Sequence, residues 1–131
     1  MCVVLIMPEF QDALRIRDEL LSGGWVSPDT YANHFSPIIL GPAVYLFLIY
    51  PDRIFDRALI GYVGMSKCLS QRLNGHEVYR KISDHGFWPC RWFMPTSAPD
   101  LRKVEADLIA RFDPLYNTIG RPVGLDRMSH G

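Results

Sequence analysis

The sequence lacks the features that mark membrane proteins and disulfide-rich secreted proteins. A membrane span needs roughly 20 consecutive apolar residues, and the longest apolar stretch, residues 38–50, is broken by Gly41 and Pro42. The three cysteines form no CxxC pair and follow no secretory leader, which is typical of a protein from a reducing cytosol. We therefore expect a soluble cytoplasmic protein with no membrane partner.

The sequence also lacks an excess of charge of either sign. It has 14 basic and 14 acidic residues, so the total charge gives no reason to expect nucleic acid as a partner. The distribution is uneven, however: residues 1–40 have two arginines against five acidic residues, whereas residues 62–92 have five basic against two acidic residues. The second segment is either a local positive field that attracts phosphate or an ordinary solvated surface.

Internal repeats and low-complexity segments are absent as well. With 131 residues, 48% of them hydrophobic, the chain has the size and composition of one compact domain. We expect an N-terminal helical extension over residues 1–40, a main domain over residues 41–120 and a tail over residues 121–131.

Hydrophobic periodicity predicts the elements of that domain. Residues 9–21 and 101–112 have apolar residues at helical spacing, and Ser97 is a candidate N-cap for the second helix. Residues 44–50 and 58–64 are typical of strands in a hairpin, and residues 91–94, between two prolines, indicate a short edge strand. Ser66 is positioned to cap a helix through Leu69, with a further helical turn at 77–82. The pattern predicts a small α+β fold.

Some polar residues stand where a simple core would not place them. Glu105 is four residues from both Leu101 and Ile109, so the helical repeat puts its carboxylate within the apolar stripe. Such a group needs an ion pair, hydrogen bonds or a metal. Arg72 and His76 are four residues apart and share a helix face if that helix continues through Gly75, an arrangement that suits a phosphate but is also common on solvated surfaces.

Two tyrosines lie on the predicted hairpin. Tyr45 and Tyr62 occur in apolar strands, where a tyrosine is usually a core residue whose hydroxyl is satisfied at the rim. Gly61 and Gly64 flank Tyr62 and indicate a bend or a close backbone approach at that strand end.

The ordered set resembles the GIY-YIG nuclease family over about residues 43–117. Ala43-Val44-Tyr45 matches the first half of the family motif and Tyr62-Val63-Gly64 the second. Arg72 follows Tyr62 by ten residues, Glu105 follows Arg72 by thirty-three and Asn117 follows Glu105 by twelve. The match departs from the family in three places, namely Ala43-Val44 for Gly-Ile, an apparent insertion at 51–57, and Met65 where many members have a polar residue.

The resemblance implies a three-stranded antiparallel or mixed sheet flanked by helices, and an endonuclease that hydrolyses DNA with one Mg²⁺ or Mn²⁺ ion. It implies that Glu105 is the only protein ligand of the metal, that Tyr45 or Tyr62 orients or deprotonates the attacking water, and that Arg72 stabilises the phosphoryl group. His76 is similar to a proton carrier of some members. We further assign supporting roles to Gly64, Ser66 and Asn117, and substrate binding to Lys67 and Arg91.

The same residues agree with other functions. A non-catalytic nucleic-acid-binding or regulatory protein of the same fold agrees with the neutral charge and with Met65. A zinc site from His76, His85 and Cys90 has spacings that do not match a standard finger. A stand-alone nuclease of this size would take its specificity from its own loops, from a homodimer or from a partner protein.

Overall fold

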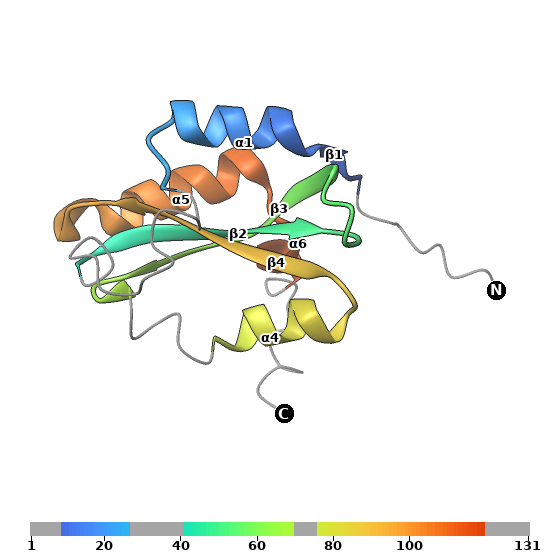
Figure 1. Cartoon of the computed structure of the whole chain (residues 1–131). Helices are drawn as coiled ribbons and strands as arrows, with labels where there is room; N and C mark the ends of the chain where they lie inside the picture. The colour runs from blue at the N-terminus through green and yellow to red at the C-terminus, as the bar shows by residue number, and fades with distance from the viewer. Residues whose placement is uncertain (1–8, 27–40, 70–75, 120–131) are drawn as a thin grey trace.

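The computed structural model describes residues 9–26, 41–69 and 76–119, and within them the chain forms an antiparallel sheet with helices on both faces (Figure 1). The sheet has four strands in the order β1-β3-β2-β4. Their bounds are Gln11–Asp12 for β1, Ala43–Tyr50 for β2, Arg57–Ser66 for β3 and Trp88–Pro95 for β4. Every pairing is antiparallel.

Strand β2 is the centre of the sheet. It has a neighbour on each side and helices above and below, and all eight of its residues are buried. Its sequence AVYLFLIY is rich in β-branched and aromatic residues, which suits a strand covered on both faces. Burial of each large apolar side chain contributes about 1.5–3 kcal/mol, so this strand holds the two faces of the core together.

Strand β3 contains an irregularity at Gly61. Phe47 pairs with Tyr62 but Leu48 pairs with Ile60, so β3 has one extra residue opposite β2, a β-bulge. A Cβ at position 61 would lie 2.2 Å from Cδ1 of Ile49, so any larger residue there would have to displace the Ile49 side chain. The bulge interrupts the alternation of side chains, so Leu59 and Tyr62 pack on the same face.

Strand β4 lies at one edge of the sheet, which explains why its prolines are tolerated. Val26 forms two backbone hydrogen bonds with Phe93, so the N–H groups of odd-numbered β4 residues point away from β2. Pro89 and Pro95 are also odd-numbered, so the N–H groups that they lack would not have bonded to β2. The predicted edge strand is confirmed and is longer than expected.

Two helices cover one face of the sheet. α1 (Ala13–Ser22) is capped by Asp12, whose side chain accepts from the N–H of Leu14, and α5 (Leu101–Phe112) ends at Asp113 in the left-handed region. We call their shared apolar cluster the α1–α5 core. It contains Ala13, Ile16, Leu20, Trp25, Val44, Leu46, Leu48, Tyr50, Ala58, Val63, Trp92, Leu101 and Leu108.

The opposite face is covered by α4 (Glu77–Asp84) and by the short α6 (Leu115–Ile119). The apolar cluster here, which we call the α4 core, contains the buried residues Ala43, Tyr45, Phe47, Ile49, Leu69, Ile82, Phe93 and Tyr116. A 3-10 turn, η2 (Ala98–Asp100), precedes α5. Ser97 precedes this turn, and its hydroxyl contacts the carboxylate of Asp100 at 2.5 Å instead of capping a backbone N–H.

The α+β class and the flanking helices are confirmed, but the strand number was wrong. The sheet has four strands instead of three, because Gln11 and Asp12 pair with Ala58 and Arg57 where the periodicity predicted the first turn of a helix. A strand of two residues is too short to show alternation in sequence. The predicted helix therefore begins at Ala13, after its cap.

No helix among the described residues is long and apolar enough to cross a membrane. The predicted tail and most of the connection between Trp25 and Pro42 lie outside the described residues.

Candidate functional site

Tyr45 lies against Gly64 on the α4 face of the sheet. The two residues are paired across β2 and β3, and the tyrosine ring covers the glycine. A Cβ at position 64 would lie 2.5 Å from both Cζ and Oη of Tyr45. The glycine of the Tyr62-Val63-Gly64 segment therefore makes the space that the tyrosine of the other strand occupies.

The hydroxyl of Tyr45 is bonded to a buried histidine. Its oxygen lies 2.7 Å from Nε2 of His76, a side chain that is 2% exposed. Nδ1 of the same ring accepts a hydrogen bond from the N–H of Val78 at 3.1 Å, so Nδ1 bears no proton. The network thus assigns a neutral ring with its proton on Nε2, which donates to Tyr45.

His76 occupies a different structural position from the one predicted. It has extended backbone dihedrals and is the N-cap of α4, so it lies outside any helix. The condition for a helix face shared with Arg72, one helix that continues to His76, is therefore not met at His76. The sequence shows no serine, threonine, aspartate or asparagine at this cap, and the ring nitrogen of His76 takes over the usual role of a side-chain oxygen.

Tyr62 joins this group through an aromatic cluster. Its ring centroid lies 5.6 Å from that of Phe47 in a stacked arrangement, 5.4 Å from the ring of His76 and 6.2 Å from the ring of Tyr45. Phe47 lies 5.0 Å from His76. Tyr62 is partly exposed, whereas Tyr45 is buried, so Tyr62 is the more accessible of the two phenols.

Arg91 contributes a cation at the margin of the cluster. It pairs with Phe47 across β2 and β4, and its guanidinium carbon lies 4.2 Å from the centroid of the Tyr79 ring. Tyr79 in turn packs edge-on against Phe47 at 5.4 Å and donates its hydroxyl to the carbonyl of Pro89. The cation is therefore oriented by stacking on an aromatic ring.

Asn117 binds the strand that carries Tyr62. Its Oδ1 accepts from the N–H of Val63 at 2.8 Å and its Nδ2 donates to the carbonyl of Val63 at 3.0 Å. The amide side chain pairs with the outer edge of β3 as a neighbouring strand would. Asn117 thus fixes the backbone between Tyr62 and Gly64 from the side opposite β2.

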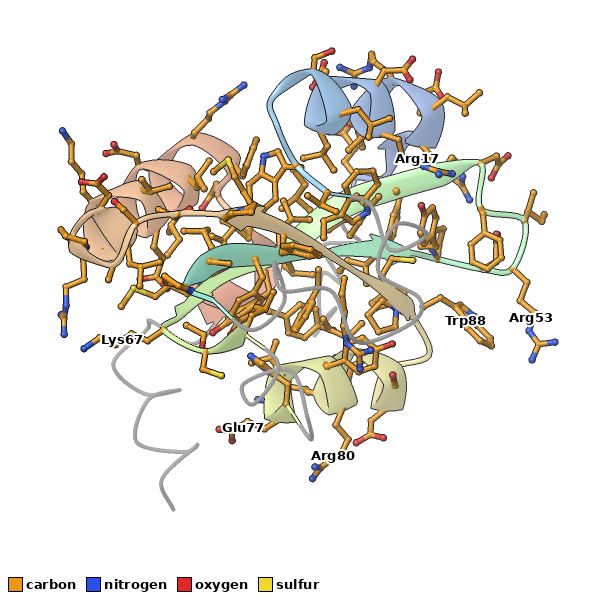
Figure 2. All side chains as sticks on the ribbon, turned by 60° about the vertical axis from the view of Figure 1, so that its left-hand side comes forward. Arg17, Arg53, Lys67, Glu77, Arg80 and Trp88 are labelled. Atoms are coloured by element: carbon orange, nitrogen blue, oxygen red, sulfur yellow. The ribbon has the colours of Figure 1, made fainter. Side chains whose placement is uncertain are left out.

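Ser66 and Lys67 follow at the end of β3. The hydroxyl of Ser66 accepts from the N–H of Cys68 at 3.1 Å and donates to the carbonyl of Cys68 at 2.8 Å, which closes a local turn. Lys67 is exposed and projects from the end of the sheet (Figure 2).

The two remaining predicted residues stand apart from this description. Arg72 lies outside the described residues. Glu105 lies on α5 and is partly buried, as are Val104 and Ile109 beside it. The apolar residues of α5 pack in the α1–α5 core, on the other face from Tyr45. The contacts above therefore join Tyr45, Tyr62 and His76 to one another.

A second tyrosine and histidine pair borders the same face. His85, at the C-cap of α4, has Nδ1 at 2.6 Å from the hydroxyl of Tyr116, and the two rings stack at 5.6 Å. Tyr116 is 6% exposed, and burial raises the pKa of its phenol above the ordinary value of 10.0. This phenol therefore stays neutral over the physiological range.

The described residues contain no group of three or more His, Cys, Asp and Glu side chains that could hold a metal ion. The zinc reading was therefore wrong, because His76 and His85 lie at opposite ends of α4. A cation held by a single carboxylate, as the resemblance implies for Glu105, does not require such a group.

Sequence reasoning missed two members of the cluster, Phe47 and Tyr79. Phe47 is two residues after Tyr45 and so shares its face of the strand. Tyr79 lies in the first turn of α4, three residues after its N-cap His76. Both spacings are visible in the sequence, but an aromatic residue within an apolar pattern does not by itself indicate a functional role.

Comparisons of the chain with family models, with curated proteins and with solved structures found no match.

Proposed function

We propose that this protein is an endonuclease that hydrolyses DNA phosphodiester bonds with one Mg²⁺ or Mn²⁺ ion, in the manner of the GIY-YIG nucleases that its motifs resemble. The observation that carries the proposal is the contact of Tyr45 with His76 beside Tyr62. A core tyrosine needs only one polar partner at the rim. Here two phenols, a histidine and a glycine that makes room for one phenol lie together on one sheet face.

The fold supports the same proposal at a coarser level. The strand of the first half motif is central, the strand of the second half motif is its antiparallel hairpin partner, and helices cover both faces. The helix with the candidate metal ligand, α5, packs against β3, the strand of the second half motif.

The hydrogen bonds and exposure of Tyr45 and Tyr62 suit them to different roles. His76 is buried and both of its ring nitrogens are engaged, so it serves as a positioning residue for Tyr45. Its Nε2–H donates to the Tyr45 oxygen and would stabilise a phenolate there. Tyr62, the more exposed phenol, is the one we assign to the attacking water, and Arg91 with Lys67 to the phosphate backbone.

The remaining roles follow the resemblance. Glu105 would hold the metal ion, which acts as a Lewis acid on the phosphate oxygens, and Arg72 would meet the charge that develops on the phosphoryl group. Asn117 and Gly64 keep β3 and Tyr45 in place.

A plasmid-nicking assay with magnesium or manganese tests this function. We expect Glu105→Gln to lower the nicking rate by about 10²–10³, the usual effect of losing one electrostatic stabiliser. Asp107→Asn is the matched control, because it removes an exposed carboxylate from the same helix and should leave the rate unchanged. Equal rates in wild type and Glu105→Gln, or no nicking in either, would favour the non-catalytic binding protein.

A further inference from the structure

Three large apolar side chains are exposed together at one end of the sheet. The turn between β2 and β3 contains Ile54, which is 73% exposed, and Phe55, which is 48% exposed, and β4 begins there with Trp88, 40% exposed. Trp88 pairs with Tyr50, the last residue of β2, so the turn and the tryptophan share this end. We call Arg53, Ile54, Phe55 and Trp88 the hairpin-end patch.

The turn is held in a shape that displays these side chains. Oδ1 of Asp52 accepts a hydrogen bond from the N–H of Ile54 at 3.0 Å, which fixes the first half of the turn. Phe55 has a φ of 61°, a left-handed conformation that a bulky residue adopts only under strain. Its ring packs edge-on against Tyr50 at 4.9 Å. Phenylalanine therefore occupies a position whose backbone conformation favours glycine.

The patch also contains a planar cation stacked on an aromatic ring. The guanidinium carbon of Arg53 lies 4.7 Å from the centroid of the Trp88 ring, and Figure 2 shows both side chains extending from this end of the molecule. Guanidinium and aromatic planes are the surfaces on which proteins stack unpaired bases. The turn itself is neutral, with Arg53 and Arg57 against Asp52 and Asp56, so binding here would depend on stacking more than on charge.

The hairpin-end patch and the tyrosine cluster are separated along β2. Tyr45 and Tyr50 are five residues apart on one strand, which corresponds to about 17 Å at the usual rise. That length equals about five base pairs at roughly 3.4 Å each. Tyr45 belongs to the α4 core and Tyr50 to the α1–α5 core, so this length is a separation along the strand between two places on opposite faces of the sheet.

We propose that the hairpin-end patch binds a nucleobase that is unpaired or easily unstacked, and so selects DNA with a mismatch, bulge or junction. The inference rests on the proposed function and names its substrate class. Extruding a base is least costly where its pairing is already defective, so a site of this kind discriminates damaged or branched DNA from a perfect duplex.

Binding without cleavage tests the inference separately from the nuclease. The full-length protein in EDTA is titrated against a duplex with a single mismatch that contains 2-aminopurine and against the perfect duplex of the same sequence. We expect tighter binding to the mismatch by about tenfold or more, with a rise in 2-aminopurine fluorescence, because stacking one base on an aromatic residue contributes an effect of that size.

The variant Phe55→Gly removes the ring and suits the left-handed backbone, so it should fold at least as well as wild type. Combined with Arg53→Gln it should abolish the preference for the mismatch. Leu14→Ser, which changes a side chain 69% exposed on α1, is the control and should keep the preference.

The outcomes separate the two proposals. Equal binding of both duplexes by wild type overturns the inference even if plasmid is nicked, and so does a preference that survives in the double variant. A mismatch preference that the double variant loses supports the patch even if no plasmid is nicked. Loss of a protein partner by the double variant, with DNA binding unchanged, assigns the patch to protein contacts and overturns the inference.

Discussion

At the scale of single residues, Gly64 and Tyr45 depend on each other, because the tyrosine ring fits only where position 64 has no side chain. The ring of Tyr45 occupies the volume that any side chain at position 64 would need. Because the ring is also bonded to His76, it cannot turn away without losing that bond in a buried position.

We therefore predict that Gly64→Ala lowers the free energy of unfolding by about 1–3 kcal/mol, the usual effect of overpacking a core. Urea denaturation measures the change. The control is Gly41→Ala, where an added Cβ meets no atom within 4 Å, so its effect should be small. In a Tyr45→Ala background the cost of Gly64→Ala should fall. An unchanged cost there would mean that the clash arises elsewhere.

Sequence reasoning was informative about which residues belong together but weaker about how they meet. Tyr45 and Tyr62 were chosen with His76, and all three lie in one aromatic cluster. The N-cap position of His76 was not predicted, because it depends on a hydrogen bond from the N–H of Val78 to the histidine ring that no propensity encodes.

At the scale of elements, the hydrogen bonds of one side chain join α6 to the edge of β3. Asn117 forms both of its hydrogen bonds with the backbone of Val63, and this pairing continues the sheet beyond the short β1. A helix of five residues has little stability of its own. Its position therefore depends on such tertiary contacts.

We predict that Asn117→Ala lowers the free energy of unfolding by about 1–3 kcal/mol, because it leaves the N–H and carbonyl of Val63 without these partners. Hydrogen exchange of the Val63 amide should accelerate in the same variant. Thr96→Ala removes one side-chain bond to the carbonyl of Met94 at a strand end and should have the smaller effect. Equal losses in the two variants would contradict the role given to Asn117.

Long elements were predictable where the periodicity was strong and local. The stripe from Leu101 to Phe112 and the apolar run of β2 were correctly assigned as helix and strand. β1 was missed because Gln11 and Asp12 are exposed and adjoin a helical pattern. Their pairing with β3 joins segments far apart in the sequence, which local periodicity does not show.

At the scale of the whole molecule, the α1–α5 core lies on one face of the sheet and the α4 core on the other. The α4 core has a buried phenol, Tyr116, on its border. Desolvation raises the pKa of this phenol in the folded state above 10.0, while the unfolded chain keeps the ordinary value. Between the two pKa values the folded state binds more protons, so stability decreases as pH rises.

We predict that the contribution of Tyr116 to stability is fully present below pH 10 and is lost as the pH rises from there through the raised pKa. Urea denaturation between pH 8 and about pH 11 measures this loss. Tyr116→Phe should reduce the slope of the unfolding free energy against pH above pH 10. An unchanged slope in the variant would assign alkaline unfolding to other groups.

The sequence did not predict which helices cover which face of the sheet. Periodicity identifies the apolar side of α1 or α5 but does not say which face of the sheet receives it. The residues of α1 were assigned to an extension, yet Ala13, Ile16 and Leu20 are part of the α1–α5 core.

The outer edge of β4 has a consequence for how copies of this protein meet. Of the four outward positions 89, 91, 93 and 95, two are prolines, and the amide of Phe93 is taken by Val26. A foreign strand would find three of these four donors missing or occupied. The addition of further strands to this edge, which is how amyloid fibrils grow, is therefore blocked. Contacts between copies on this side would form through side chains instead.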